Sequence, residues 1–242
     1  MIAEGLVDAG VSVVISSRDA AACTSVAARL SELGQCVAIP ADLSKPAECQ
    51  RLADEVMHLA PNLDILVNNA GATWGAPLLE YDEGAWERVL ALNVKGVFHL
   101  TRALSTHLST TGTPEHPARI INIGSIDGLR VPGLETYAYT ASKAALHQLT
   151  RHLAGRLGPN VTVNAVAPGP FESRMMASTL ELFGDQIIAE SPLHRIGRPS
   201  DVAGVVIFLA SCAGSYLTGA VIPVDGGIYT VGMQGVSAAS TR

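Results

Sequence analysis

Short apolar runs rich in β-branched residues alternate along the chain with longer stretches of helical periodicity. The runs predict strands at residues 11–15, 37–39, 65–67, 119–123, 161–166 and 221–224. The clearest helical stretch between them covers residues 138–157. Strands that alternate with helices predict right-handed βαβ units and a parallel sheet. We therefore expect an α/β protein in which helices cover the sheet.

The composition is that of one compact domain. The chain has 242 residues, of which 48% are hydrophobic, so it can bury a large core. Neither a repeat nor an interdomain linker interrupts the sequence, and we expect a single domain over residues 1–242. The small and polar residues from 231 to 242 predict a loose tail or a subunit contact.

Charge and hydropathy narrow the range of partners. The formal net charge of −6 argues against a nucleic-acid surface. No apolar run approaches the length of a membrane span, and the first residues lack the regions of a signal peptide, which predicts a cytoplasmic protein. The cysteines lack paired metal spacing, so we expect reduced thiols and no metal site at Cys23, Cys36, Cys49 and Cys212.

Three residues near the middle of the chain can together move a proton. Tyr139 and Lys143 are four apart in a helical stretch, so they lie on one face of the helix. An ammonium beside a phenol stabilises the phenolate and lowers the Tyr pKa toward working pH, as a general acid or base requires. Ser125 follows an apolar run and a glycine, which places its hydroxyl on a loop at a strand end.

Further motifs accompany this group. Asn68 begins an Asn-Asn-Ala-Gly run after an apolar strand, Asn93 lies in Leu-Asn-Val, and residues 164–169 read Asn-Ala-Val-Ala-Pro-Gly, with Ser173 shortly after. With these motifs the chain resembles the short-chain dehydrogenase/reductase family over residues 1–229. Within that family it is most similar to NADPH-dependent 3-oxoacyl reductases of the rhamnolipid-biosynthesis type. The resemblance implies a Rossmann-like, doubly wound parallel sheet with helices on both faces.

The resemblance also implies roles for the reacting group. Ser125 would hydrogen-bond the substrate carbonyl, Tyr139 would give it a proton as hydride arrives from NADPH, and Lys143 would lower the Tyr139 pKa and bond the nicotinamide ribose. Asn93 would hold a water that links Lys143 to solvent, or would satisfy helix backbone at a kink. Tyr137 competes for the acid role, but only Tyr139 is one helical turn from Lys143.

A partial cofactor site follows from the same comparison. Ser17 and Arg18 end the first predicted strand, where NAD-selective relatives carry an acid for the ribose 2′-OH. A guanidinium there suits the 2′-phosphate of NADP(H), with a solvated Arg at a helix start as the alternative. Asp42 and Leu43 would flank the adenine, unless Asp42 is a plain turn residue. The other implied cofactor contacts, besides Tyr139 and Lys143, are Asn69, Ala70, Gly71, Pro168, Gly169 and Ser173.

The sequence departs from the family pattern at its start. Members begin with a strand and a Gly-rich turn that holds the cofactor pyrophosphate, whereas this chain begins within the helix that follows the turn. We therefore expect the first strand to be missing, which leaves its two neighbours in the sheet without a shared partner. Either the natural start lies upstream, which we favour, or a truncated form exists that is unstable or inactive.

The predicted reaction is reduction of a ketone, a 3-oxoacyl thioester by resemblance, to an alcohol with NADPH. Two alternatives remain: a dehydrogenase of a sugar, steroid or polyol, and an inactive pseudoenzyme or binding module. Isolated histidines on helices predict packing or solvation rather than chemistry, which applies to His99, His147 and His152.

The helical stretches at 86–107 and 138–157 predict assembly. Each carries apolar residues on more faces than one sheet contact can cover: Val89, Leu92, Val97 and Leu100 on the first, and Leu146, Leu149 and Leu153 on the second. A surface stripe of this kind marks an interface, so we expect a homotetramer or at least a homodimer. The alternative is that the loop from Gly71 to Asp82 and the C-terminal tail of the same chain cover both faces.

Overall fold

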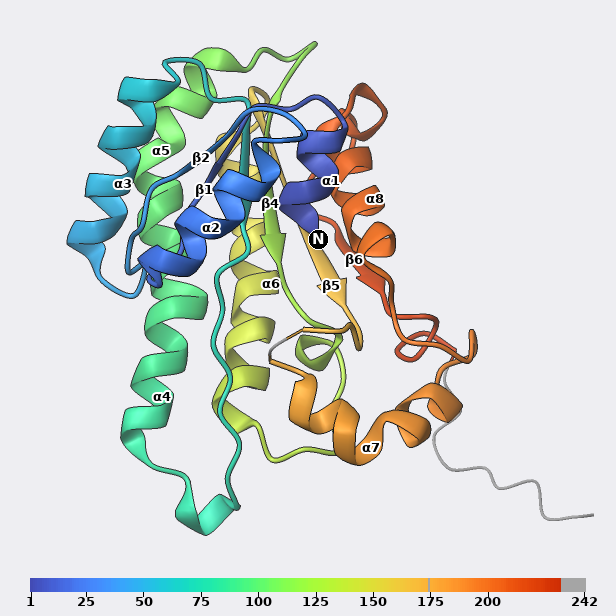
Figure 1. The fold of residues 1–242 in the computed structure, drawn as a ribbon. Coiled ribbons are helices and arrows are strands. Elements are labelled where there is room, and N and C mark those ends of the chain that lie inside the picture. Colours follow the sequence, from blue (N-terminus) through green and yellow to red (C-terminus); the bar gives the residue numbers. More distant parts are fainter. Residues whose placement is uncertain (174, 232–242) are drawn as a thin grey trace, which may run out of the picture.

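The computed structural model describes residues 1–173 and 175–231, so most of the predicted tail lies outside the described residues. Parallel strands form the centre and helices lie on both faces (Figure 1). The strands are β1 (Val13–Ile15), β2 (Cys36–Ala38), β3 (Ile65–Asn68), β4 (Ala118–Ile123), β5 (Val161–Pro168) and β6 (Val221–Val224). The helices are α1 (Ile2–Asp8), α2 (Ala20–Leu30), α3 (Pro46–Leu59), α4 (Glu83–Leu90), α5 (Val97–Thr111), α6 (Tyr137–Leu157), α7 (Ala177–Glu190) and α8 (Pro199–Ala210).

The strands form two parallel sheets. β1 pairs with β2, and a separate sheet has the order β3-β4-β5-β6. No hydrogen-bonded ladder joins β1 to β3 among the described residues. These are the two strands that were predicted to lack a shared neighbour, and the predicted doubly wound α/β architecture is confirmed.

Apolar side chains on both faces of the strands hold the helices in place. On one face, α3, α5 and α6 pack over β4 and β5 through a cluster that includes Leu52, Leu104, Ile120, Ala154 and Val163. On the other face, α1 and α8 pack over β4 and β5 through Leu6, Ile121, Val166, Val206 and Leu209, while α2 covers β1 and β2. Burial of these side chains is the main favourable contribution to folding.

All the strands run parallel, so their carboxyl ends lie at the same edge. The loops that follow β1, β3, β4 and β5 therefore gather there, and they carry the residues that the sequence singles out. This edge is where open α/β sheets bind their ligands. Among the described helices, none is both long enough and apolar enough to cross a membrane.

The apolar stripe predicted on two helices is largely an internal surface. Val89, Val97, Leu100 and Leu146 are each at most 5% exposed within one chain. Leu92, Leu149 and Leu153 are half-buried. The prediction of a broad exposed stripe was therefore wrong for the four buried residues, because the sheet and neighbouring helices already cover their side chains. Phe98 on α5 is 42% exposed, so this helix does present an apolar side chain at the surface.

Candidate active site

Helix α6 presents Tyr139 and Lys143 to the carboxyl end of β4. Lys143 is only 4% exposed, and its Nζ donates a 2.7 Å hydrogen bond to the Ile123 carbonyl, the last residue of β4. The same Nζ lies 5.6 Å from the centroid of the Tyr139 ring. The i, i+4 spacing thus places phenol and ammonium side by side, as the sequence predicts. The roles of the two residues remain a prediction.

Ser125 lies on the loop between β4 and α6. It caps the short 3-10 turn Ile126–Gly128, and its Oγ accepts a hydrogen bond from the Asp127 N–H at 3.1 Å. Its backbone is extended, with φ −165°. The side chain is buried and is close enough to Tyr139 to affect the titration of that phenol. The loop therefore brings Ser125 and Tyr139 together.

The titration behaviour of this group differs from the expectation. Burial raises the pKa of Tyr139 above its ordinary value, the Ser125 hydroxyl lowers it in part, and the charge of Asp127 raises it further. Burial also lowers the pKa of Lys143 from 10.5 to about 8. The predicted lowering of the Tyr139 pKa by Lys143 was wrong for this structure. The reason is that desolvation of the phenolate outweighs the polar contacts the phenol receives.

Asn93 fastens the loop after β3 to the helices. It is fully buried on a π-helical segment, Ala91–Gly96, between α4 and α5. Its Oδ1 accepts from the Ala72 N–H at 2.8 Å, and its Nδ2 donates to the Ala72 carbonyl and to Ser142 Oγ, each at 2.9 Å. Asn93 thus does lie where a helix departs from α geometry, but its partners are a loop and α6 rather than its own helix. Single-turn π segments of this kind are frequent at functional sites.

The loop after β1 carries Ser17 and Arg18. Arg18 is exposed and makes no ion pair with a described residue. Ser17 Oγ accepts from the N–H of Asp19, which caps α2 by accepting from the Ala22 N–H at 3.0 Å. The guanidinium is therefore free to meet an anion at this strand end.

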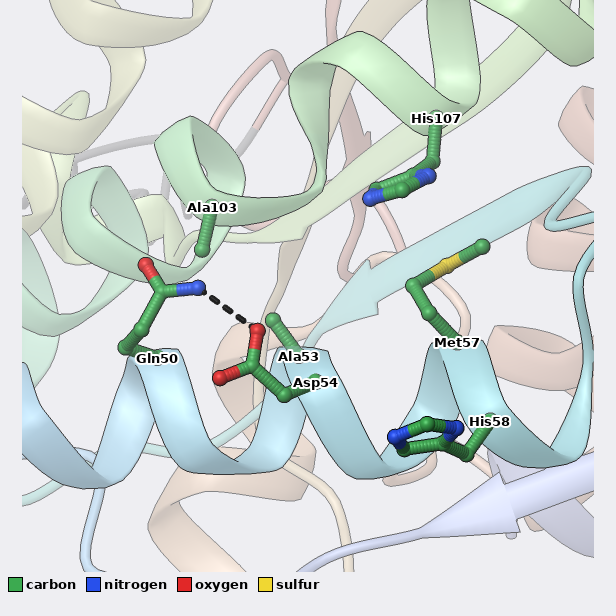
Figure 2. Close-up of a pocket in the computed structure, with 7 residues that line it drawn as sticks. All are labelled: Gln50, Ala53, Asp54, Met57, His58, Ala103 and His107. Atoms are coloured by element: carbon green, nitrogen blue, oxygen red, sulfur yellow. Dashed lines mark hydrogen bonds between the residues drawn. The ribbon is translucent and has the colours of Figure 1, made fainter.

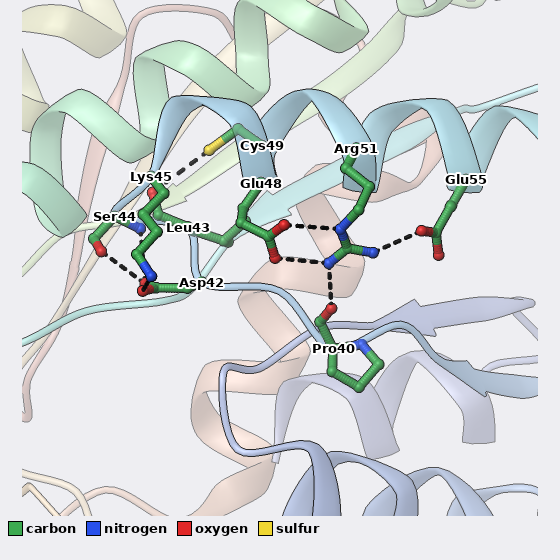
Figure 3. A network of polar contacts seen from close by, with 9 residues as sticks. All are labelled: Pro40, Asp42, Leu43, Ser44, Lys45, Glu48, Cys49, Arg51 and Glu55. Atoms are coloured by element: carbon green, nitrogen blue, oxygen red, sulfur yellow. Dashed lines mark hydrogen bonds and ion pairs between the residues drawn. The ribbon is translucent and has the colours of Figure 1, made fainter.

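Asp42 lies in a loop held by its own polar contacts (Figure 3). Its Oδ1 accepts from the Ser44 hydroxyl at 2.7 Å, and its Oδ2 lies 3.4 Å from Lys45 Nζ. The Ser44 hydrogen bond is the largest cause that lowers the pKa of Asp42. The Leu43 carbonyl packs so closely on Gly96 that no side chain would fit at position 96. These contacts account for Asp42 as a turn residue, and its place beside adenine stays a prediction.

Two more loops complete this edge. Asn69 is exposed, and Gly71 lies so near the reacting group that an added Cβ would be 3.7 Å from Lys143 Nζ. Ala70 lies between them. At the end of β5, Pro168 is paired with β6, and the Gly169 N–H donates to the Val224 carbonyl at 3.0 Å. Ser173 follows, and its Oγ accepts from the Met176 N–H at 3.3 Å.

Other candidates lie apart from this group. The Tyr137 hydroxyl donates to Glu135 Oε1 at 2.8 Å, which engages it outside the reacting group. A hollow of about 400 Å³ lies between α3 and α5 (Figure 2), but none of the predicted catalytic or cofactor residues lines it. Within the described ranges, no cluster of three or more possible metal ligands occurs.

The sequence analysis gives no role in the site to two of the groups that lie in it. Ser142 binds Asn93, and its hydroxyl also donates to the Tyr139 carbonyl at 2.7 Å. His147, predicted to be merely packed or solvated, is 2% exposed and lies one turn beyond Lys143 on α6. The signal for His147 was present in the spacing, since residues 139, 143 and 147 fall on one helical face.

Comparison with known proteins gives the family. Residues 1–229 match the family model described as enoyl-(acyl carrier protein) reductase. The chain is 49% identical over 235 residues to the rhamnolipids biosynthesis 3-oxoacyl-[acyl-carrier-protein] reductase of Pseudomonas aeruginosa, which covers 95% of this chain and 91% of that protein. It is 40% identical over 229 residues to a galactitol 2-dehydrogenase (L-tagatose-forming) of Cereibacter sphaeroides, over 92% of this chain and 86% of the relative.

Solved structures agree. The RhlG/NADP active-site complex of Pseudomonas aeruginosa superposes with a TM-score of 0.91 at 48% identity, over 94% of this chain and 90% of the other. A gluconate 5-dehydrogenase from Burkholderia cenocepacia in complex with NADP and tartrate superposes with a TM-score of 0.85 at 30% identity, over 94% and 89%. With the strand-end site described above, these matches show that the chain belongs to the short-chain dehydrogenase/reductase family.

Proposed function

We propose that this protein reduces the ketone of a 3-oxoacyl thioester to an alcohol with NADPH. The observation that carries the proposal is the convergence of Ser125, Tyr139 and Lys143 at the carboxyl end of β4. Relatives at 49% and 37% identity are 3-oxoacyl-[acyl-carrier-protein] reductases, which supports the substrate class.

The residues present fit the two ends of NADPH. Arg18 offers a guanidinium with no ion-pair partner among the described residues, which suits a 2′-phosphate. Beside it, the buried Oγ of Ser16 has no hydrogen-bond partner in the described chain. Residue 71, a glycine, places no side chain of its own next to Lys143 Nζ. When bound, NADPH supplies the hydride.

The proton chemistry belongs to the chain itself. Because its pKa is raised, Tyr139 is a protonated phenol at neutral pH, which is the form that donates a proton to a developing alkoxide. Ser125 would hold the carbonyl oxygen within reach of that phenol and stabilise the charge that develops there. Lys143, still an ammonium below a pH of about 8, adds a positive charge 5.6 Å from the centre of the Tyr139 ring. Asn93 keeps the Gly71 loop and α6 in register around this group.

A direct assay tests the proposal. The purified chain is mixed with NADPH and a 3-oxoacyl thioester, carried on coenzyme A in one series and on acyl carrier protein in the other, and NADPH oxidation is followed by absorbance. Turnover that disappears in Tyr139→Phe supports the proposal. NADPH binding with no turnover of any carbonyl would instead indicate the pseudoenzyme.

A second function has a specific observation in its favour. The galactitol 2-dehydrogenase relative at 40% identity acts on a polyol, so polyol oxidation with NADP is the alternative. Parallel assays with galactitol and with the thioester separate the two. A higher kcat/KM for galactitol would replace the thioester by a sugar alcohol while leaving the roles of Ser125 and Tyr139 unchanged. No relative described above supports the steroid alternative.

Assembly and location complete the proposal. We infer a homotetramer or homodimer of a cytoplasmic enzyme that functions as one domain. The half-buried Leu149 and Leu153 on α6 and the exposed Phe98 on α5 support an interface on these helices. Light scattering measures the assembly directly. A mass near the 25.2 kDa of a single chain would refute it.

A further inference from the structure

A third residue of the α6 face touches the loop that carries Ser125. His147 follows Lys143 by four residues, as Lys143 follows Tyr139, so the three side chains form a row along the helix. The His147 side chain is 2% exposed. The reaction steps proposed above give His147 no role, although it is as deeply buried as Lys143 and lies on the same helix face.

The imidazole lies directly against the two glycines that flank the Ser125 turn. A Cβ added at Gly124 would overlap His147 Nε2, and a Cβ added at Gly128 would come within 2.9 Å of His147 Cε1. Gly124 and Gly128 bracket Ser125 and its 3-10 turn, and the Gly124 N–H is held on the Val166 carbonyl at 2.7 Å. The ring therefore fills the space between α6 and the backbone on both sides of Ser125.

The ring acts on this loop by contact. Neither His147 nitrogen makes a hydrogen bond of ordinary geometry with a described residue. Burial, and then the charge of Lys143, lower the pKa of His147 to about 4, with the Gly128 backbone opposing them in part. The ring is therefore neutral at working pH and adds no second cation beside Lys143. Since close-packed interiors transmit small displacements, its volume fixes how far the loop stands from α6.

We infer that His147 is a positioning residue, whose ring holds the Gly124–Gly128 loop at the distance from α6 that sets Ser125 against Tyr139. The inference rests on the proposed carbonyl reduction. It differs from a purely structural role in one measurable respect. A displacement of Ser125 by about 1 Å should lower kcat, because the substrate carbonyl is no longer correctly oriented. The KM for NADPH should stay unchanged.

A double-mutant cycle tests the contact. Gly124→Ala pushes a methyl group into the ring, and we expect kcat to fall about 100-fold, the scale of a misplacement of about 1 Å. His147→Ala removes the ring, and we expect about a tenfold loss of kcat with the KM for NADPH unchanged. In the double variant the methyl group no longer meets the ring and keeps only a 3.2 Å contact with the Val166 carbonyl oxygen, so kcat should recover about tenfold relative to Gly124→Ala alone.

Gly128→Ala is the matched control. A Cβ there would also lie 2.7 Å from the Lys143 backbone carbon and 2.8 Å from the Ala144 nitrogen, so removing His147 should not rescue it. His147→Leu restores a similar volume without a charge and should keep kcat within about threefold of wild type. Wild-type kcat in His147→Ala, absence of rescue at Gly124, or equal losses in His147→Leu and His147→Ala would each overturn the inference.

The same cycle can be measured without substrate, by urea unfolding of wild type, the two single variants and the double variant. His147→Ala should relieve the destabilisation caused by Gly124→Ala, and absence of that relief overturns the inference whatever the catalytic result. Wild-type protein that binds NADPH yet reduces no carbonyl would refute the proposed function instead. The two failures are therefore distinguishable.

Discussion

Replacing Lys143 by Met should stabilise the protein, and the gain should depend on pH in a defined way. Lys143 is an ammonium in the unfolded chain up to its ordinary pKa of 10.5, but burial in the folded protein lowers that pKa to about 8. This lowering of the Lys143 pKa corresponds to about 3 kcal/mol of folding free energy, because each tenfold change in proton affinity is worth about 1.4 kcal/mol. The Lys143→Met variant no longer has this ionisation cost.

The sign follows from proton binding. Between a pH of about 8 and 10.5, the unfolded chain binds the Lys143 proton and the folded chain does not, so wild-type stability rises with pH in this interval. Below about 8, Lys143 is charged in both states and the full cost is present. The free energy of unfolding of Lys143→Met minus that of wild type should therefore be constant below about 8 and then decrease by about 3 kcal/mol as pH approaches 10.5.

Urea unfolding followed by far-UV circular dichroism measures this difference. Both proteins are compared at equal concentration and at several pH values, so that other titrations and any assembly cancel. Lys95→Met is the control, because Lys95 is exposed and its only charged partner in the described chain is the exposed Glu87, at 3.2 Å, a surface pair that contributes little to stability. A stability difference that stays flat from pH 7 to 10.5 would refute the buried, destabilised ammonium.

Three further changes test the site. Tyr139→Phe removes the proposed proton donor and should reduce kcat by about 10² to 10⁴ while leaving NADPH binding, followed by its fluorescence, unchanged; a loss smaller than tenfold contradicts the role. Arg18→Asp should weaken NADPH by about tenfold or more and spare NADH, because a carboxylate repels the 2′-phosphate, and an unchanged ratio of the two KM values would make Arg18 a surface residue. Asn93→Leu leaves the Ala72 backbone without partners and should cost about 3 kcal/mol in urea unfolding, whereas Ser142→Ala, which removes one of the three bonds, should cost less.

The strands were predicted from local patterns, but their ends depend on the backbone partners that the folded chain supplies. β1 begins at Val13 rather than at Val11, because the Val11 N–H donates to the Leu6 carbonyl at the exit of α1. β5 extends beyond the predicted end to Pro168, since Ala167 and Pro168 pair with β6. An apolar run identifies a strand, but it does not show which of its residues form hydrogen bonds with a neighbouring strand.

The site divides in the same way. The juxtaposition of Tyr139 and Lys143 was predictable because it depends on helical periodicity alone. The direction of the Tyr139 pKa was not, because it depends on how deeply β4, its loop and α6 bury the phenol. The π segment that carries Asn93 was also hidden, since one extra residue in a turn leaves the apolar pattern almost unchanged.

On the inner face of α6, the free-energy cost of burying a charge comes from one group, the Lys143 ammonium. Lys143 Nζ ends on the Ile123 carbonyl, at the point where β4 stops and the Ser125 loop begins. A carbonyl at a strand end accepts this bond without any loss from the ladder, so the ammonium is fixed there by one strong hydrogen bond while its remaining N–H groups stay available. His147, one turn further, fills the adjacent volume with a ring that stays neutral. Lys143 therefore places a positive charge near the phenol at a cost in folding free energy. Because His147 is neutral, no second cation repels the Lys143 ammonium and raises that cost further.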